Sequence, residues 1–114
     1  MGVQHVIRGQ VLVCQPEGDL DEAALLKILD LAGSPDQART RGLVLDLGSA
    51  NYISSQGVAG LLRLQTSLAG QKRTLSMANP SPLVRRILYQ AGVAQAIPIH
   101  STVEAACEEI GKPP

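Results

Sequence analysis

Two adjacent serines, Ser54 and Ser55, are the side chains in this sequence best placed to take part in chemistry. They lie where an expected loop, residues 48–53, meets a segment with helical periodicity that runs from residue 55 to residue 69. Serine is a preferred N-cap because its hydroxyl accepts a hydrogen bond from the first turn of a helix. One cap needs only one serine, so the pair leaves a second hydroxyl at the helix start without a structural duty.

The helix expected after these serines carries small residues along one flank. Gly57 and Gly60 lie in its first turns, although each glycine costs about 1 kcal/mol relative to alanine in a helix. With Leu64 and Ser67 they form a low-relief stripe beside the predicted core face, which consists of Val58, Leu61, Leu62, Gln65 and Leu68. Glycines at such positions let another backbone approach closely. Their spacing leaves open whether that backbone belongs to this fold or to a partner.

The remaining sequence predicts neither catalysis nor metal binding. The two histidines, His5 and His100, are expected at strand ends, and neither neighbours a serine-containing turn in a way that suggests a general base. Clustered metal ligands and the glycine-rich phosphate-binding motifs are both absent from the sequence. The carboxylates of Asp19 and Asp21 are better suited to helix capping than to acid–base catalysis. We therefore expect no enzyme activity, no cofactor and no metal.

Length, charge and cysteine content favour a single cytoplasmic domain. A chain of 114 residues can bury one core without disulfides or metal. Ten basic and ten acidic residues cancel and form no runs, which argues against nucleic acid or an anionic membrane as a partner. Cys14 and Cys107 lack motif spacing and indicate a reducing compartment. With no signal peptide and no apolar run of the ~18 residues that span a membrane, we expect no membrane insertion.

Periodicity along the chain predicts elements in the order β-β-α-β-α-β-α-β-α. Strands are expected at residues 3–7 and 10–15, which form a hairpin, then at 43–47, at 74–78 and, as a short edge strand, at 96–99. Helices alternate with them, starting at a cap formed by Asp19 or Asp21, at Ser55, at Ser81-Pro82 and at a Ser101/Glu104 capping box. This order indicates an α/β fold, in which helices pack against a mixed, mostly parallel sheet. Functional groups of such folds gather where strands end and helices begin.

Four segments in sequence order resemble the successive signatures of the STAS domain family. They are Gly18-Asp19-Leu20-Asp21, Leu43-Val44-Leu45-Asp46-Leu47, Tyr52-Ile53-Ser54-Ser55-Gln56-Gly57-Val58, and Asn79-Pro80-Ser81-Pro82-Leu83-Val84-Arg85-Arg86-Ile87-Leu88 followed by Ala91-Gly92-Val93. The resemblance runs from about residue 9 to residue 110, nearly the whole chain. It implies a single STAS-like domain at residues 1–111 and a short C-terminal tail at residues 112–114.

The STAS resemblance implies a bacterial anti-sigma-factor antagonist that works by partner switching. In that group the unphosphorylated protein binds an anti-sigma factor, a serine kinase of the histidine-kinase-like ATPase fold, and so releases a sigma factor for transcription. The kinase phosphorylates one serine, which ends the contact, and a phosphatase resets it. The matching phosphoserine is Ser55, with Ser54 as the second choice. Gln56, between Ser55 and Gly57, is larger than the usual Ser or Ala of the family.

The expected partner surface combines the two loops with the glycine flank. Its residues are Asp19, Asp21, Ser54, Gln56, Gly57, Gly60, Leu64 and Ser67. Two other roles of STAS domains stay open: an accessory subunit of a lipid-transport ABC system, and a stressosome-type scaffold. Weak self-association is a further expectation. A small α/β enzyme or nucleotide binder is disfavoured by the missing motifs.

Overall fold

The computed structural model describes residues 3–111 and is built on a five-stranded sheet in the order β1-β2-β4-β6-β7. The strands are β1 Val3–Arg8, β2 Val11–Pro16, β4 Gly42–Asp46, β6 Thr74–Ala78 and β7 Ile99–His100. β1 pairs antiparallel with β2 through a hairpin, and every other pair in this sheet is parallel. The predicted α/β fold with a mixed, mostly parallel sheet is therefore confirmed.

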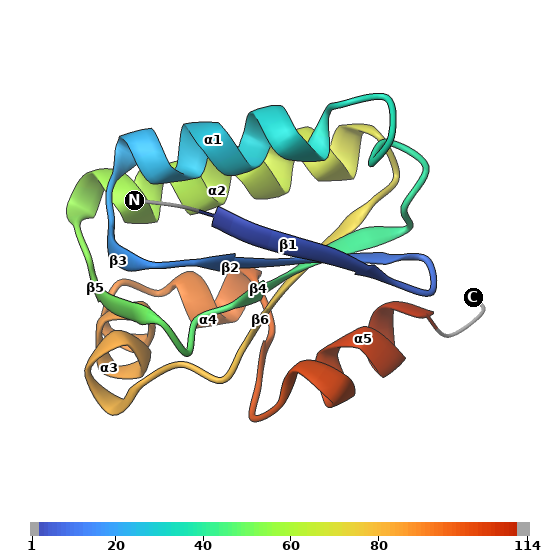
Figure 1. The fold of residues 1–114 in the computed structure, drawn as a ribbon. Helices are drawn as coiled ribbons and strands as arrows, with labels where there is room; N and C mark the ends of the chain where they lie inside the picture. The colour runs from blue at the N-terminus through green and yellow to red at the C-terminus, as the bar shows by residue number, and fades with distance from the viewer. Residues whose placement is uncertain (1–2, 112–114) are drawn as a thin grey trace.

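Helices cover the two faces of the sheet unequally (Figure 1). The helices α1 (Glu22–Ala32) and α2 (Ser55–Gly70) lie side by side on one face, and α5 (Val103–Gly111) lies on the other. The main core, which includes Leu12, Leu43 and Leu45, lies under α1 and α2. A smaller cluster with Val11, Val44 and Ile110 lies under α5. Because β2 and β4 are covered on both sides, they read as continuous apolar runs.

Two strands were not predicted, and they form a small second sheet. β3 (Gly18–Leu20) and β5 (Ala50–Ile53) pair in parallel, whereas residues 48–53 were expected to be a loop. Both strands are short, and Asn51 and Tyr52 in β5 are exposed, so no apolar run marks them in the sequence. Their pairing is tertiary: it depends on the ends of β2 and β4 lying next to each other.

The C-terminal third differs from the expectation in three details. The edge strand expected at residues 96–99 begins at Ile99, because a short helix, α4 (Val93–Ala96), follows α3 (Pro82–Gln90). Pro98 precedes the strand, and its carbonyl accepts the N–H of Met77 at 2.9 Å. The last helix is capped by Thr102, whose Oγ1 accepts the N–H of Ala105 at 3.1 Å, rather than by Ser101. The expected tail at residues 112–114 lies outside the described residues.

A buried arginine fastens the end of the molecule opposite the β3–β5 sheet. Arg73 is 6% exposed, and its guanidinium donates to the carbonyl oxygens of Thr40 (3.0 Å), Ala32 (2.9 Å) and Gln37 (3.0 Å). It also donates to Thr40 Oγ1 at 2.7 Å and to the side chain of Gln71 at 3.0 Å. Burial lowers the pKa of Arg73 from its usual value. These bonds tie the end of α1, the segment before β4 and the turn after α2 into one unit.

Candidate partner-binding site

The small β3–β5 sheet brings together two loops that are remote in sequence. In this sheet Asp19 lies opposite Tyr52, and Leu20 lies opposite Ile53. The N–H of Gly18 donates to the carbonyl of Ser49 at 3.0 Å, and the N–H of Ser54 donates to the carbonyl of Leu20 at 3.0 Å. The starts of α1 and α2 therefore lie at the same end of the molecule, next to β3 and β5 (Figure 1).

The structure assigns different positions to the two serines. Ser54 is the N-cap of α2: its Oγ accepts the N–H of Gly57 at 3.0 Å and donates to the carbonyl of Leu20 at 3.3 Å. Ser55 is the first residue of the helix and its side chain is exposed. No hydrogen bond joins Ser55 Oγ to any other described residue. The second hydroxyl anticipated from the sequence is thus that of Ser55.

The two acidic residues of the neighbouring loop, Asp19 and Asp21, also differ in whether their side chains cap a helix. Asp21 is the N-cap of α1, and its Oδ1 accepts the N–H of Ala24 at 2.9 Å. Asp19 is exposed on β3. Glu22, in the first turn of α1, forms an exposed ion pair with Arg63 of α2 at 3.5 Å. Of these three carboxylates, that of Asp19 takes part in neither the cap nor the ion pair.

A shallow groove of about 220 Å³ lies beside Ser55. Its walls are formed by Tyr52, Ile53, Ser54, Ser55, Val58, Ile87 and Ala91. Sequence reasoning missed Tyr52, Ile87 of α3 and Ala91, which follows that helix. The packing of α3 against β5 creates this wall, and no local pattern in α3 marks it. Tyr52 is 46% exposed, so an aromatic surface adjoins the free serine. Gln56, the next residue after Ser55, is also exposed.

The glycine flank proposed as part of the partner surface lies inside the fold instead. A Cβ on Gly60 would lie 2.7 Å from Cβ of Leu25, and one on Gly57 would collide with the carbonyl oxygen of Leu20. Leu64 is 1% exposed and belongs to the core. The expectation that these three residues face a partner is wrong, because the close approach is that of α1 and β3. Ser67 is half-buried on the same helix.

The core face of α2 is correspondingly rotated from the prediction. The buried side chains include Leu61, Leu64 and Leu68, whereas Leu62, placed in the core by the sequence pattern, is 40% exposed. Because the glycines allow α1 to approach closely, the buried stripe runs through Gly57 and Gly60. This rotation leaves the exposed surface at the start of α2 to Ser55 and Gln56.

The described residues offer little other chemistry. Within residues 3–111, no group of three or more His, Cys, Asp or Glu side chains is arranged to hold a metal ion. None of the helices in this range is long and apolar enough to cross a membrane. Cys14 is fully buried, and burial raises the pKa of its thiol to about 12. Burial also raises the pKa of Cys107, so neither thiol is an activated nucleophile.

Comparison with known proteins identifies the family of this chain. A model of the STAS domain family matches residues 3–106. A STAS-domain containing protein of Pseudomonas aeruginosa (strain UCBPP-PA14) is 34% identical over 91 residues, which make up 80% of this chain and 89% of that protein.

Solved structures share the fold over almost the whole chain. An anti-sigma factor antagonist from Mycobacterium paratuberculosis is 18% identical, with 97% of this chain and 94% of that chain covered and a TM-score of 0.81. The anti-sigma factor antagonist SpoIIAA in its unphosphorylated form is 21% identical, with 96% of each chain covered and a TM-score of 0.77. A sulfate transporter family protein from Wolinella succinogenes is 16% identical, with 92% and 88% covered and a TM-score of 0.75. At these identities the structural likeness shows the fold alone. The family model, which matches residues 3–106, shows that the chain belongs to the STAS domain family.

Proposed function

We propose that this chain is an anti-sigma-factor antagonist whose binding is switched off by phosphorylation of Ser55. The observation that carries the proposal is the division between the two serines. Ser54 Oγ caps α2 as an acceptor and donates to the Leu20 carbonyl of β3, whereas Ser55 is exposed at the first position of α2. A kinase can therefore reach the hydroxyl of Ser55 without opening the fold.

A phosphate at this position suits a switch that leaves the domain intact. It adds about −1.5 to −2 charge at pH 7. At the N-terminus of a helix an anion is favoured by about 0.3–1 kcal/mol, so the folded domain tolerates it. The same charge enclosed in an interface without a partner costs about 3–5 kcal/mol. At about 1.4 kcal/mol per tenfold change in affinity, that cost lowers affinity by roughly two to three orders of magnitude.

The proposed contact surface consists of Asp19, Tyr52, Ser55 and Gln56 with the adjoining groove. These side chains are exposed and lie next to one another around β3 and β5. The partner is an anti-sigma factor that is also a serine kinase of the histidine-kinase-like ATPase fold, and a phosphatase restores Ser55. In this role the protein is a cytoplasmic regulator of bacterial transcription and does not act as an enzyme.

Relatives with the same fold include both anti-sigma factor antagonists and transporter domains. SpoIIAA, an anti-sigma factor antagonist, has been solved in an unphosphorylated form and, as a Bacillus cell fate determinant, in a phosphorylated form. The phosphorylated form is 20% identical to this chain, with a TM-score of 0.67. The exposed hydroxyl at the start of α2 favours such a switch here, since an accessory subunit of a transporter has no need of it.

The test is phosphorylation with matched serine variants. The protein is incubated with ATP and, one at a time, with the anti-sigma-factor kinases of its own organism, and the modified residue is located by mass spectrometry. Ser54→Asn keeps a good N-cap but removes the hydroxyl, so this variant should still gain one phosphate. Ser55→Ala should gain none. A phosphate that persists in Ser55→Ala and disappears in Ser54→Asn would refute the assignment to Ser55.

A further inference from the structure

Strand β1 forms an unprotected edge of the sheet. All of its residues except Val3 are exposed, and no other described strand pairs with its outer side. Val6 and Ile7 point to opposite faces of the sheet and are 53% and 44% exposed. Natural edge strands are usually protected by proline, lysine or a bulge. β1 has neither residue type, and it pairs with β2 at all six positions without a shift in register.

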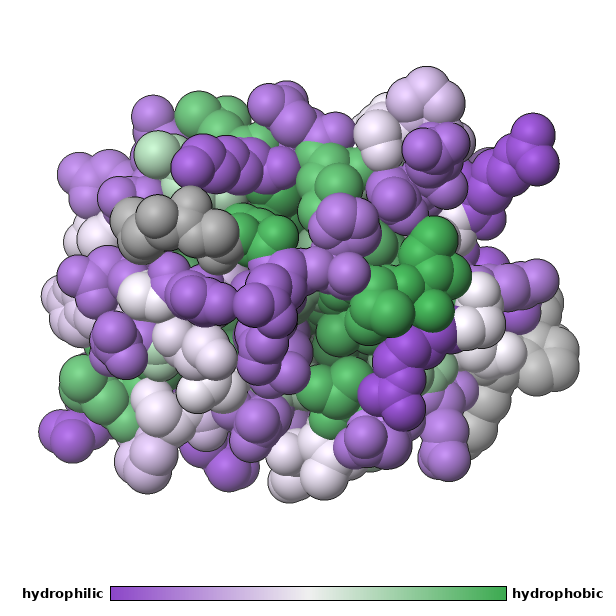
Figure 2. All heavy atoms as spheres, viewed as in Figure 1, coloured by the Kyte–Doolittle hydropathy of each residue, from purple (hydrophilic) through white to green (hydrophobic). Residues whose placement is uncertain are grey.

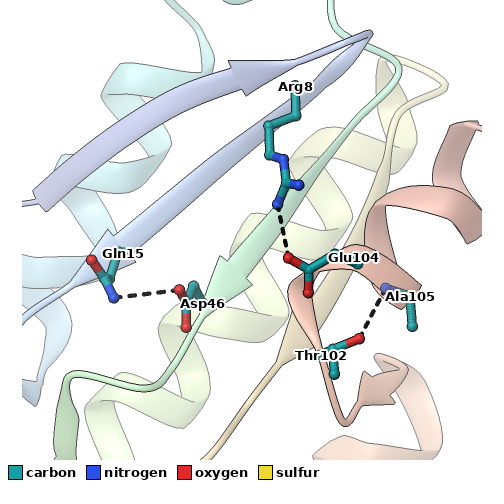
Figure 3. Close-up of polar contacts among 6 residues, drawn as sticks. All are labelled: Arg8, Gln15, Asp46, Thr102, Glu104 and Ala105. Atoms are coloured by element: carbon teal, nitrogen blue, oxygen red, sulfur yellow. Dashed lines mark hydrogen bonds and ion pairs between the residues drawn. The ribbon is translucent and has the colours of Figure 1, made fainter.

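Apolar surface is exposed along this edge. Figure 2 shows an apolar patch where β1 runs into its hairpin with β2, bordered by hydrophilic side chains. Next to it, on the α5 side of the sheet, a groove of about 300 Å³ is lined by Gln4, Val6, Arg8, Val13, Val103 and Glu104, among others. Arg8 reaches over this groove to Glu104 at 3.5 Å, and the two side chains are 46% and 68% exposed (Figure 3).

We propose that β1 pairs with β1 of a second copy of this chain in antiparallel orientation. The two-fold axis of such a pair is perpendicular to the sheet, so directly opposed residues lie on the same face. The register places Val6 opposite Val6 of the second copy and Ile7 opposite His5. The two five-stranded sheets then continue as one sheet, and the exposed apolar side chains of β1 become neighbours across the axis.

Charge complementarity favours a second copy as the partner, and the apolar Val6 pair on the axis favours this register. With Val6 on the axis, Arg8 lies opposite Gln4 of the second copy. The amide of Gln4 donates to Oε1 of Glu17 at 3.3 Å within its own chain. Arg8 therefore approaches an acidic side chain of the other copy, and the symmetry repeats the contact. Sliding the pair one way would place Ile7 on the axis and Arg8 opposite Val6, farther from Glu17. Sliding it the other way would place His5 on the axis and separate the two Val6 side chains.

This pairing surface is separate from the site proposed for the partner switch. The groove beside β1 and the groove beside Ser55 share no lining residue. Self-pairing should therefore be unchanged in Ser55→Asp. The two proposals can accordingly fail independently.

The first experiment measures the association of the full chain by sedimentation equilibrium from micromolar to millimolar concentration. The wild type should show a monomer–dimer equilibrium. Val6→Lys places two like charges on the axis and should weaken the dimer by about a hundredfold, since such a juxtaposition costs several kcal/mol. Leu83→Lys, at a site of similar exposure (46%) on α3, is the matched control and should associate like the wild type. A wild type that stays monomeric, or equal dimerisation of Val6→Lys and the wild type, overturns the proposal.

A second experiment tests the register. Arg8→Glu and Glu17→Arg should each weaken the dimer, and the double variant should restore it, because the exchange rebuilds the intermolecular pair. The exchange does not restore the contact between Arg8 and Glu104 of the same chain. A recovered dimer therefore points to the Arg8–Glu17 pair between the two copies. Under oxidation, Val6→Cys should form a disulfide-linked dimer, whereas Gln4→Cys should not, since opposed residues of an antiparallel pair lie within disulfide range. Absence of both the recovery and the Val6→Cys link overturns the register.

Discussion

The hydroxyl of Ser54 is occupied as both donor and acceptor, while that of Ser55, one position later, is exposed. This difference has a direct consequence for stability. An N-cap serine contributes about 0.5–2 kcal/mol relative to alanine. A serine at the first helical position contributes much less, because its side chain satisfies no backbone group.

We predict that Ser54→Ala lowers the free energy of unfolding by about 1 kcal/mol, whereas Ser55→Ala changes it by less than about 0.5 kcal/mol. Urea unfolding followed by far-UV circular dichroism measures both. Ser54→Asn serves as the control and should remain close to the wild type, because asparagine caps as well as serine. A larger loss in Ser55→Ala than in Ser54→Ala would contradict the assignment of the cap.

Aspartate at position 55 separates folding from binding. We expect Ser55→Asp to alter the free energy of unfolding by no more than about 1 kcal/mol, since a carboxylate suits the N-terminal turn of a helix. Affinity for the anti-sigma factor should fall by roughly two to three orders of magnitude. Calorimetric titration of the purified partner gives the affinity, and thermal melting gives the stability. A melting temperature that collapses together with the affinity would make the effect structural.

The buried thiol of Cys14 makes stability depend on pH in the alkaline range. Burial raises the pKa of this thiol to about 12, whereas a cysteine thiol in the unfolded chain has a pKa of about 8.5. Between these values the unfolded chain loses a proton that the folded chain keeps. Stability is therefore complete below the unfolded pKa and declines as the pH rises, with a slope of up to about 1.4 kcal/mol per pH unit.

The measurement is the free energy of unfolding from about pH 7 to about pH 10, which lies on both sides of the unfolded thiol's pKa of about 8.5. Wild type should lose stability more steeply than Cys14→Ala toward the alkaline end, although the variant starts lower because it leaves a cavity. Cys107→Ser, at a half-buried position, should keep most of the wild-type slope. Parallel curves for wild type and Cys14→Ala would show that the thiol does not contribute.

Among the elements, α2 illustrates what a single helix pattern can and cannot predict. Its start at Ser55 and its length follow from capping and periodicity, and the structure confirms them. The buried stripe does not follow, because glycine has no side chain and contributes nothing to an apolar pattern. Only the position of α1, with Leu25 against Gly60, identifies the glycines as internal.

Gly60→Ala is therefore expected to lower the melting temperature, although alanine has the higher helix propensity. The added methyl meets Leu25 at 2.7 Å, and overpacking of this kind costs about 1–3 kcal/mol, more than the gain of about 1 kcal/mol in propensity. Leu25→Gly removes the Cβ that the added methyl would meet, and so creates space at the same contact. The double variant should consequently be more stable than the sum of the single effects, as measured by a double-mutant cycle. Additive effects on the free energy of unfolding would show that positions 25 and 60 do not interact.

The strands likewise differ in how well the sequence predicts them. The hairpin and the strands β4 and β6 are predictable because their patterns are local. β3 and β5 are not, since each is short and their pairing requires β2 and β4 to be adjacent. The candidate site inherits this division. Ser55, Asp19 and Gln56 are exposed as expected, whereas the groove wall contributed by Tyr52 and α3 emerges only from the tertiary arrangement.

At the scale of the whole molecule, Arg73 connects three segments at the end opposite the candidate site. It donates to the carbonyl groups of Ala32, Gln37 and Thr40. Arginine supplies several donors in a fixed planar arrangement, and lysine cannot reproduce that arrangement. The sequence reveals nothing of this role, since an arginine after a helix usually lies in solvent.

We predict that Arg73→Met lowers the free energy of unfolding by about 3 kcal/mol, because it leaves buried carbonyl groups without donors. Arg73→Lys should recover only part of the loss. Arg63→Met, which removes an exposed ion pair, should change stability by no more than about 1 kcal/mol. Chemical unfolding of the three variants provides the comparison. Near-equal stability of Arg73→Met and wild type would show that water replaces the guanidinium.

Tyr52 gives the protein an optical property. The chain contains no tryptophan, and its tyrosines are Tyr52 and Tyr89, so its near-ultraviolet emission comes from phenol rings alone. Tyr52 lines the same groove as Ser55 and is 46% exposed. A phosphate dianion accepts a proton readily from an excited phenol and thereby quenches its emission. In a Tyr89→Phe variant, the fluorescence of Tyr52 should therefore fall as Ser55 is phosphorylated, so that the unlabelled protein reports its own modification in real time.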